Sequence, residues 1–226
     1  MTDAIVVRRM DGGPRLVLDE PHLLASDFFR LDASSVGPTA FDARAGQGDP
    51  NRITAEDLRA INQTMRARAR HSAWEAELGA AEPLPWLAAI NLAWDLIATN
   101  DATWASSDCA RVIATAVEKS TGRYRGKSVA TKVLHVKRPK VFPILDSLAL
   151  EQLGATNKSV RATLDHLRAV GRENLKQLRA VQAFLEEQQI TRSLVRVLDG
   201  LLWASHPGAG LMPKLGAWER TMRRRP

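Results

Sequence analysis

The chain has 226 residues, 45% of them hydrophobic and 25% charged, a balance that is typical of globular proteins and excludes a disordered or low-complexity chain. Its single cysteine, Cys109, excludes an intramolecular disulfide and any centre held by several thiolates, and we interpret it as a packed core residue. No apolar run approaches membrane-spanning length and the N-terminus has no secretory pattern, so we expect a cytoplasmic protein with no membrane partner.

The net charge of +7 is distributed unevenly along the chain. Residues 1–110 hold 10 basic and 16 acidic side chains, a balance of −6, whereas residues 111–226 hold 22 basic and 9 acidic side chains, a balance of +13. A basic half beside an acidic half is the charge pattern of proteins that bind phosphate or nucleic acid. Because the same asymmetry occurs in proteins that bind neither, it favours a nucleic-acid partner, DNA in the first place, without excluding other roles.

The first fifty residues predict a small β element followed by a loop. Two short apolar runs, Ile5–Val7 and Leu16–Leu18, flank an Asp-Gly-Gly-Pro turn and are typical of a hairpin. Residues 34–51 are rich in Gly, Pro, Ser and Asp, which indicates a long surface loop. We therefore predict an N-terminal annex at 1–50 and a helical domain at 51–226.

Beyond residue 51 the spacing of apolar residues is helical. Thr54, with Asp57 three residues later, has the form of a capping box and predicts the start of the first long helix. The apolar segment from Trp86 to Trp94 predicts another helix. Asn100 or Asp101 is placed to cap a single further helix that ends before Gly122. More helices are predicted at about 127–137, 146–153, 158–169, 172–187 and 191–204. The fold class is therefore mainly α with a small N-terminal β element.

The most basic stretch of the chain lies between Gly122 and Leu150 and has no carboxylate before Asp146. Its cations are Arg123, Arg125, Lys127, Lys132, Lys137, Arg138 and Lys140. Such a cluster is typical of a surface that binds the phosphate backbone of nucleic acid. We expect Lys127 and Lys132 to lie on a largely exposed face of the helix at 127–137.

This stretch resembles the helix-hairpin-helix DNA glycosylase superfamily, and in particular its adenine-mispair glycosylases. Their glycine-x-serine-x-alanine pattern is matched by Gly126, Ser128 and Ala130, and their Phe-Pro-Ile-Leu-Asp motif by the residues from Phe142 to Asp146. The separation of twenty residues between Gly126 and Asp146 fits that family without a gap. The resemblance implies a glycosylase-like helical domain, a role in DNA repair and Asp146 as the catalytic carboxylate of a hydrolase.

The resemblance also implies roles for residues before Asp146. Bifunctional lyases of the superfamily carry a Schiff-base lysine where this chain has Ser128, so monofunctional base excision is implied. The residues that would contact nucleic acid are Tyr124, Arg125, Gly126, Lys127, Ser128, Lys132 and Lys137. Tyr124 stands where the family's hairpin carries another glycine. The adenine-mispair enzymes hold an iron–sulfur cluster with four cysteines, which a chain with one cysteine cannot build. The five histidines lack the spacing of zinc ligands. We therefore expect no cofactor and no metal.

Two roles are open for Asp146. Breaking an N-glycosidic bond develops positive charge on the sugar, which a fixed carboxylate stabilises. Aspartate is also a favoured helix N-cap, so Asp146 can simply cap the helix that follows it.

A second resemblance covers 49–60, 130–146 and 195–203, which look like a family of bacterial proteins with lysine-arginine-proline, here Lys137 to Pro139, before the proline-aspartate element. It implies a shared fold and no assigned reaction. Three functions remain: DNA base excision, a non-catalytic DNA- or RNA-binding module on the same scaffold, and a protein-interaction domain.

Overall fold

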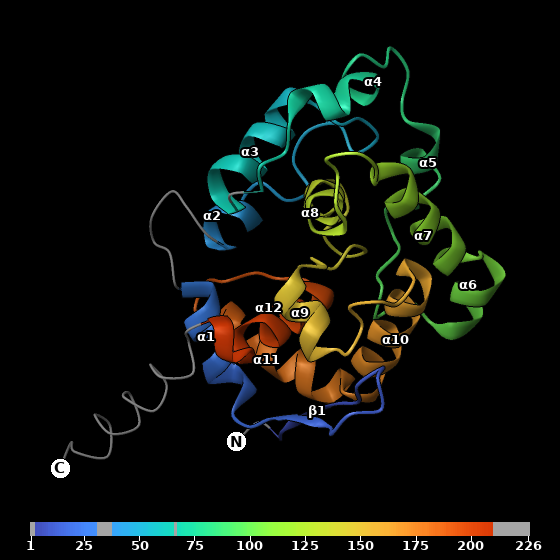
Figure 1. The fold of residues 1–226 in the computed structure, drawn as a ribbon. Helices are drawn as coiled ribbons and strands as arrows, with labels where there is room; N and C mark the ends of the chain where they lie inside the picture. The colour runs from blue at the N-terminus through green and yellow to red at the C-terminus, as the bar shows by residue number, and fades with distance from the viewer. Residues whose placement is uncertain (1–2, 31–37, 66, 210–226) are drawn as a thin grey trace.

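The computed structural model describes residues 3–30, 38–65 and 67–209. In these residues the protein is mainly α-helical with one small two-stranded sheet, as the sequence predicted (Figure 1). The helices are α1 (Pro21–Arg30), α2 (Pro38–Asp42), α3 (Ala55–Met65), α4 (Glu75–Leu78), α5 (Pro85–Ala88), α6 (Asp101–Ser106), α7 (Cys109–Ser120), α8 (Lys127–Lys137), α9 (Ser147–Gln152), α10 (Val160–Glu173), α11 (Leu175–Glu187) and α12 (Leu194–Ser205). No helix in the described part of the chain combines the length and the apolar character that a membrane crossing requires.

The predicted hairpin forms from β1 (Ile5–Val7) and β2 (Leu16–Leu18), which pair antiparallel with Val6 opposite Val17. It is fastened to the C-terminal helices by Asn174, between α10 and α11. The Asn174 amide donates to the carbonyl of Val6 and accepts from its N–H group, both at 2.9 Å. The hairpin therefore packs against the helices that lie at the other end of the sequence.

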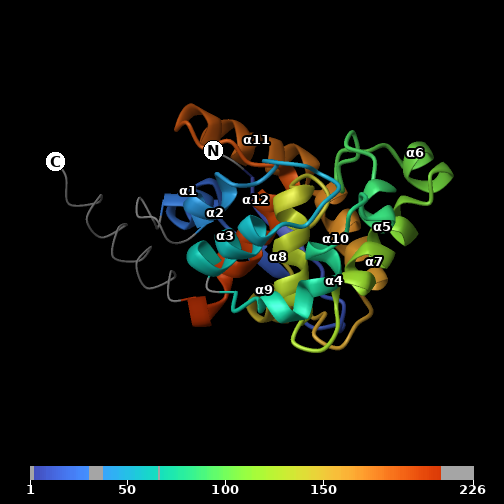
Figure 2. The same cartoon turned by 90° about the horizontal axis from the view of Figure 1, so that it is seen from above.

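The helices form two groups with α8 between them (Figure 1). One group contains α2 to α7, and the other contains α1, α9 to α12 and the hairpin. Helices α7 and α10 pack on each other and connect the two groups. Seen from above, α8 stands in the centre of the molecule with other helices around it (Figure 2). The chain crosses between the groups in the loop that joins α8 to α9.

The segment 34–51, which we predicted to be a loop, contains helix α2, while residues 34–37 lie outside the described residues. Helix α2 packs against α1 and α3. Phe41 is fully buried, and burying this large side chain in the core stabilises a short helix in an otherwise polar segment.

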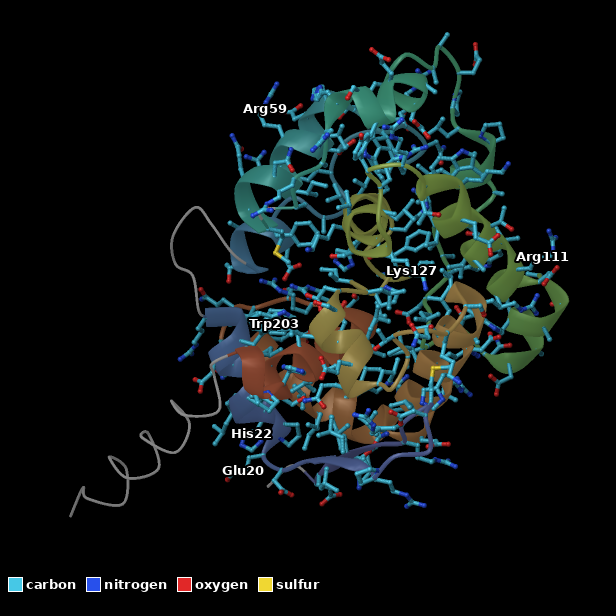
Figure 3. All side chains as sticks on the ribbon, in the orientation of Figure 1. Glu20, His22, Arg59, Arg111, Lys127 and Trp203 are labelled. Carbon is cyan, nitrogen blue, oxygen red and sulfur yellow. The ribbon has the colours of Figure 1, made fainter. Side chains whose placement is uncertain are left out.

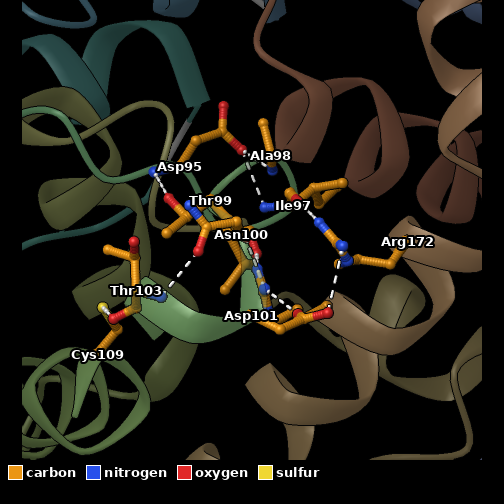
Figure 4. Close-up of polar contacts among 11 residues, drawn as sticks. Asp95, Ile97, Ala98, Thr99, Asn100, Asp101, Thr103, Cys109 and Arg172 are labelled. Carbon is orange, nitrogen blue, oxygen red and sulfur yellow. Dashed lines mark hydrogen bonds and ion pairs between the residues drawn. The ribbon is translucent and has the colours of Figure 1, made fainter. Parts of the chain in front are cut away.

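Two helix starts carry the caps that the sequence predicted. Before α3, the N–H of Thr54 donates to Asp57 Oδ2 at 2.7 Å and the N–H of Asp57 donates to Thr54 Oγ1 at 3.2 Å. Before α6, Asn100 Oδ1 accepts from the N–H of Thr103 at 2.8 Å (Figure 4). The single helix predicted after Asn100 is in fact two, because Asp108, with φ of 48°, separates α6 from α7.

The prediction of a helix across the apolar segment from Trp86 to Trp94 was wrong beyond Ala88, where α5 ends. The reason lies in side chains that compete for the backbone N–H groups. Asn91 Oδ1 accepts from the N–H of Ala93 at 2.9 Å. Further along, Asp95 Oδ1 accepts from the N–H groups of Ile97 and Ala98 at 2.9 and 2.8 Å (Figure 4). These bonds hold the chain in a turn that leads to Asn100.

Helix α8 is a core helix, and the prediction that Lys127 and Lys132 lie on a largely exposed face of it was wrong for Lys132. Eight of its eleven residues, from Ala130 onward, are buried. Lys132 is 8% exposed and Lys137 only 3% exposed. The sequence could not show this, because the burial of a helix with polar residues on several faces depends on what packs around it, here α3 and α7.

His135 lies in the core on α8, with a side chain that is 1% exposed. Its Nδ1 is 2.7 Å from the carbonyl oxygen of Phe142; a carbonyl only accepts, so this nitrogen carries the proton. Burial lowers the pKa of His135 to about 4, and the positive charge of Arg196 adds to that effect while Asp42 opposes it. His135 is therefore neutral in the folded protein at neutral pH.

The protein should lose stability through His135 as the pH falls from about 6.5 to about 4. In the unfolded chain the imidazole takes up a proton near pH 6.5, whereas in the fold it stays neutral down to about pH 4. Neutral His135 therefore contributes about 3 kcal/mol to the free energy of unfolding above pH 6.5, and this contribution is lost as the pH falls towards 4. Urea unfolding at pH 7 and pH 4 measures the loss in the wild type and in His135→Asn, which can donate without titrating. The carboxylates titrate in both proteins, so equal pH dependence in the two would contradict this role for His135.

Candidate nucleic-acid site at the start of α8

Much of the basic cluster is used to hold the fold together. Lys137 Nζ lies 2.6 Å from Asp57 Oδ2, and both side chains are buried. Arg125 Nη1 lies 2.5 Å from Glu77 Oε1, and its guanidinium is 4.8 Å from the centre of the Trp74 ring. Arg125 and Lys137 were predicted contacts to nucleic acid, and each is paired with a carboxylate of its own chain.

Arg138 is likewise a structural cation with 3% exposure. Its guanidinium donates to the side chain of Asn51 and to the backbone carbonyls of Pro50, Leu87, Ile90 and Lys137. These bonds join the end of α8 to the segment that precedes α3 and to α5 and the turn that follows it. Three of the cations that the sequence suggested for a surface, at 132, 137 and 138, are thus buried.

The turn before α8 does present exposed groups. Gly122 and Arg125 close it through two backbone hydrogen bonds, of 2.9 and 3.1 Å. Tyr124 lies between them with φ of 65° and a side chain that is 53% exposed. The guanidinium carbons of Arg70 and Arg123 lie 4.5 and 5.0 Å from the centre of its ring. An exposed tyrosine in a left-handed conformation, with two arginines against its ring, is an uncommon feature of a turn.

The first turn of α8 is open to a ligand. Gly126 occupies the N-cap position without a capping side chain. Its φ of −66° is ordinary for any residue, and a Cβ at Gly126 would have no atom within 4 Å. Glycine is therefore not needed by the fold at this position, and it leaves the backbone N–H groups of the helix start uncovered. A helix N-terminus of this kind attracts anions.

Two lysines from different parts of the chain meet beside this helix start. Lys127 Nζ donates to the carbonyl of Lys158 at 3.0 Å, which places the exposed loop before α10 next to α8, and Figure 3 shows Lys127 between these parts of the chain. We call Arg70, Arg123, Tyr124, Lys127 and Lys158 the turn cluster. Sequence reasoning missed Arg70 and Lys158, because they lie far from the turn along the chain and carry no motif of their own.

Asp146 is the N-cap of α9, and its Oδ1 accepts from the N–H of Ala149 at 3.0 Å. Buried side chains fix the loop that leads to it. Thr131 Oγ1 accepts from the N–H of Leu145 at 3.1 Å, and Asp199 Oδ2 accepts from the N–H of Ile144 at 2.8 Å. Because α8 and α12 both hold the loop, the position of Asp146 is set by the tertiary structure.

Lys132 lies near Asp146 and is hydrogen-bonded to Ser128. Its Nζ donates to Ser128 Oγ at 3.2 Å. Burial lowers the pKa of Lys132, while the carboxylate of Asp146 is near enough to oppose that change. Ser128, Lys132 and Asp146 therefore place a hydroxyl, an amine and a carboxylate near one another, and Lys132 and Asp146 form no ion pair in the structure. Such a cluster can stabilise a developing positive charge and orient a water molecule.

Comparison with known proteins adds a family. No curated protein and no solved structure matches the chain. Residues 23–206 match a family described as a family of unknown function, DUF6308. The match extends from α1 to the end of α12 and includes all of the turn cluster and Asp146. Since this covers most of its length, the chain belongs to family DUF6308.

Proposed function

We propose that the protein binds DNA at the turn cluster and removes a base by hydrolysis with Asp146, as a monofunctional glycosylase on a helix-hairpin-helix glycosylase-like fold. The observation that carries the proposal is the placement of two features along one helix. The uncapped start of α8 lies next to Lys127 and the loop of Lys158, and about one turn further along Lys132 is near enough to Asp146 for that carboxylate to act on its charge. A phosphate bound at the start of α8 would bring the sugar of a neighbouring nucleotide towards Asp146.

The start of α8 suits a DNA phosphate because dipole and charge act together there. Free N–H groups of the first turn point at the anion, and Arg123, Lys127 and Lys158 supply salt-dependent attraction. Tyr124 is exposed, so its ring can stack on a base or sugar. Lys137, which is buried at the end of α8, takes no part in binding the phosphate, since it would have to leave Asp57.

Asp146 suits base excision because its carboxylate is held in place before the reaction begins. Oδ1 is engaged by Ala149, which leaves Oδ2 to face the positive charge that develops on the sugar. A carboxylate that is already oriented needs no reorganisation in the transition state. Ser128 stands where lyases place a Schiff-base lysine, which supports hydrolysis by water without a covalent intermediate.

A second function, DNA or RNA binding without catalysis, is favoured by the same hydrogen bond from Ala149 to Asp146. That bond is the ordinary contact of a helix cap. If capping is the only role of Asp146, the turn cluster would still bind nucleic acid.

Asp146→Asn is expected to abolish base release from a panel of lesion-bearing oligonucleotides and to leave DNA binding unchanged. Asparagine keeps the cap but loses the charge that stabilises the sugar cation. Base release is measured as strand breakage after alkali, and borohydride should trap no covalent adduct with the wild type. A trapped adduct would contradict the monofunctional mechanism and identify a lysine, with Lys132 the first to examine.

Asp165→Asn is the matched control, because Asp165 is an exposed aspartate on α10 in a surface pair with Arg161. It should change neither release nor binding. DNA binding is measured by fluorescence anisotropy at several salt concentrations. Arg123→Glu should weaken this binding. Arg59→Glu is its control, because Arg59 lies on α3 (Figure 3). Binding without release from any lesion would leave the non-catalytic module, and no binding at low salt would leave a protein-interaction domain.

A further inference from the structure

A cavity of about 550 Å³ lies at the opposite end of α8 from the turn cluster. Lys127 begins α8 and Lys137 ends it, and the cavity is lined by Pro139 and Lys140 just beyond that end. Its other walls come from the segment after α2, the turn at Asp95, helix α11 and the residues that lead into α12. A volume of this size is typical of sites for small molecules.

Three cationic side chains line the cavity, and each comes from a different part of the chain. They are Lys140 after α8, Arg179 on α11 and Arg192 before α12. Lys140 and Arg179 are exposed, and neither forms an ion pair with any residue that the structure describes. Convergence of unpaired cations in a concave site indicates an anionic ligand.

Arg192 is held in position without a ligand. Its side chain is only 11% exposed, with Nε 2.7 Å from Asp42 Oδ2. Its guanidinium lies 5.0 Å from the centre of the Phe29 ring, and Nη1 donates to the carbonyl of Thr191 at 2.7 Å. A cation that is fixed in advance loses little conformational entropy when it binds an anion.

Two carboxylates also line the cavity, and they differ in what surrounds them. Asp42 is neutralised by Arg192 and by Arg196, whose Nε lies 2.8 Å from Asp42 Oδ1. Asp95 uses Oδ1 to accept from the backbone N–H groups of its own turn, so its Oδ2 can accept from a hydroxyl or amino group of a ligand. The start of α12, a helix of twelve residues, adds positive potential at the same wall through Leu194.

We propose that this cavity binds a phosphate monoester that carries hydroxyl or amino groups, as sugar phosphates and nucleotides do. The phosphate is held by Lys140, Arg179 and Arg192, and Asp95 accepts a hydrogen bond from the rest of the ligand. The site is separate from the turn cluster and does not depend on base excision.

Calorimetric titration of the full chain at low salt with ribose 5-phosphate, ribose and inorganic phosphate tests the proposal. Ribose 5-phosphate should bind, inorganic phosphate should bind more weakly, and ribose should not bind. Arg179→Glu should weaken ribose 5-phosphate binding by at least about tenfold, because it reverses the charge of a phosphate ligand. Lys176→Glu is the matched control, since Lys176 is exposed on the same helix and does not line the cavity.

Both variants replace exposed side chains, so an unchanged melting temperature confirms that they fold. The proposal is overturned if ribose 5-phosphate fails to bind at millimolar concentration, or if Arg179→Glu binds it as tightly as Lys176→Glu does. Equal affinity for inorganic phosphate and ribose 5-phosphate would also overturn it, because Asp95 would then contribute no recognition of the ester.

Discussion

Arg196→Met is expected to lower the free energy of unfolding by about 3–5 kcal/mol, because it removes one partner from a buried ion cluster. Arg196 is 3% exposed, with Nε 2.8 Å from Asp42 and Nη1 in contact with Asp199. Although burial opposes its charge, the carboxylates of Asp199 and Asp42 raise the pKa of Arg196. Methionine would fill the space but leave Asp199 as a buried carboxylate without a cation.

Urea unfolding at pH 7, followed by circular dichroism, measures this loss. Arg161→Met is the control, because Arg161 pairs with Asp165 at the surface and should contribute no more than about 0.5 kcal/mol. A loss below about 1 kcal/mol for Arg196→Met would mean that Asp199 finds another way to be solvated or neutralised. Because Asp199 also accepts from the N–H of Ile144, the variant should loosen the loop before Asp146 as well.

Arg138→Lys is expected to destabilise the protein by about 3 kcal/mol, although it conserves the charge. The guanidinium of Arg138 donates to five acceptors in different directions, four of them backbone carbonyls. An ammonium group presents its three donors at one point and cannot reach the same set. The remaining carbonyls would be buried without partners, and each such group is costly.

Thermal unfolding should show a decrease of about 6–12 °C for Arg138→Lys, given the size of the chain. The reverse exchange at an exposed site, Lys119→Arg, is the control and should leave the melting temperature within about 2 °C. If Arg138→Lys were equally neutral, the hydrogen bonds of Arg138 would not be what joins α8 to the earlier segments.

Local sequence signals were sufficient for most elements. The helices predicted at 127–137, 172–187 and 191–204 correspond to α8, α11 and α12 within a few residues, because the spacing of apolar residues and the stop signals act within one turn of the chain. The capping box at Thr54 and the cap at Asp146 are equally local. The helix prediction failed where a side chain, Asn91, competed for a backbone N–H group within the segment.

The sequence by itself determined that the chain is mainly α-helical, that its second half is basic and that Asp146 begins a helix. Only the tertiary structure decided which charges are at the surface, because a lysine such as Lys137 is buried only when a distant segment supplies a carboxylate, here Asp57. The same holds for the two candidate sites. Lys158 joins the turn cluster and Arg179 joins Lys140 at the cavity through packing between elements, and packing between distant elements leaves no signal in the spacing of neighbouring residues.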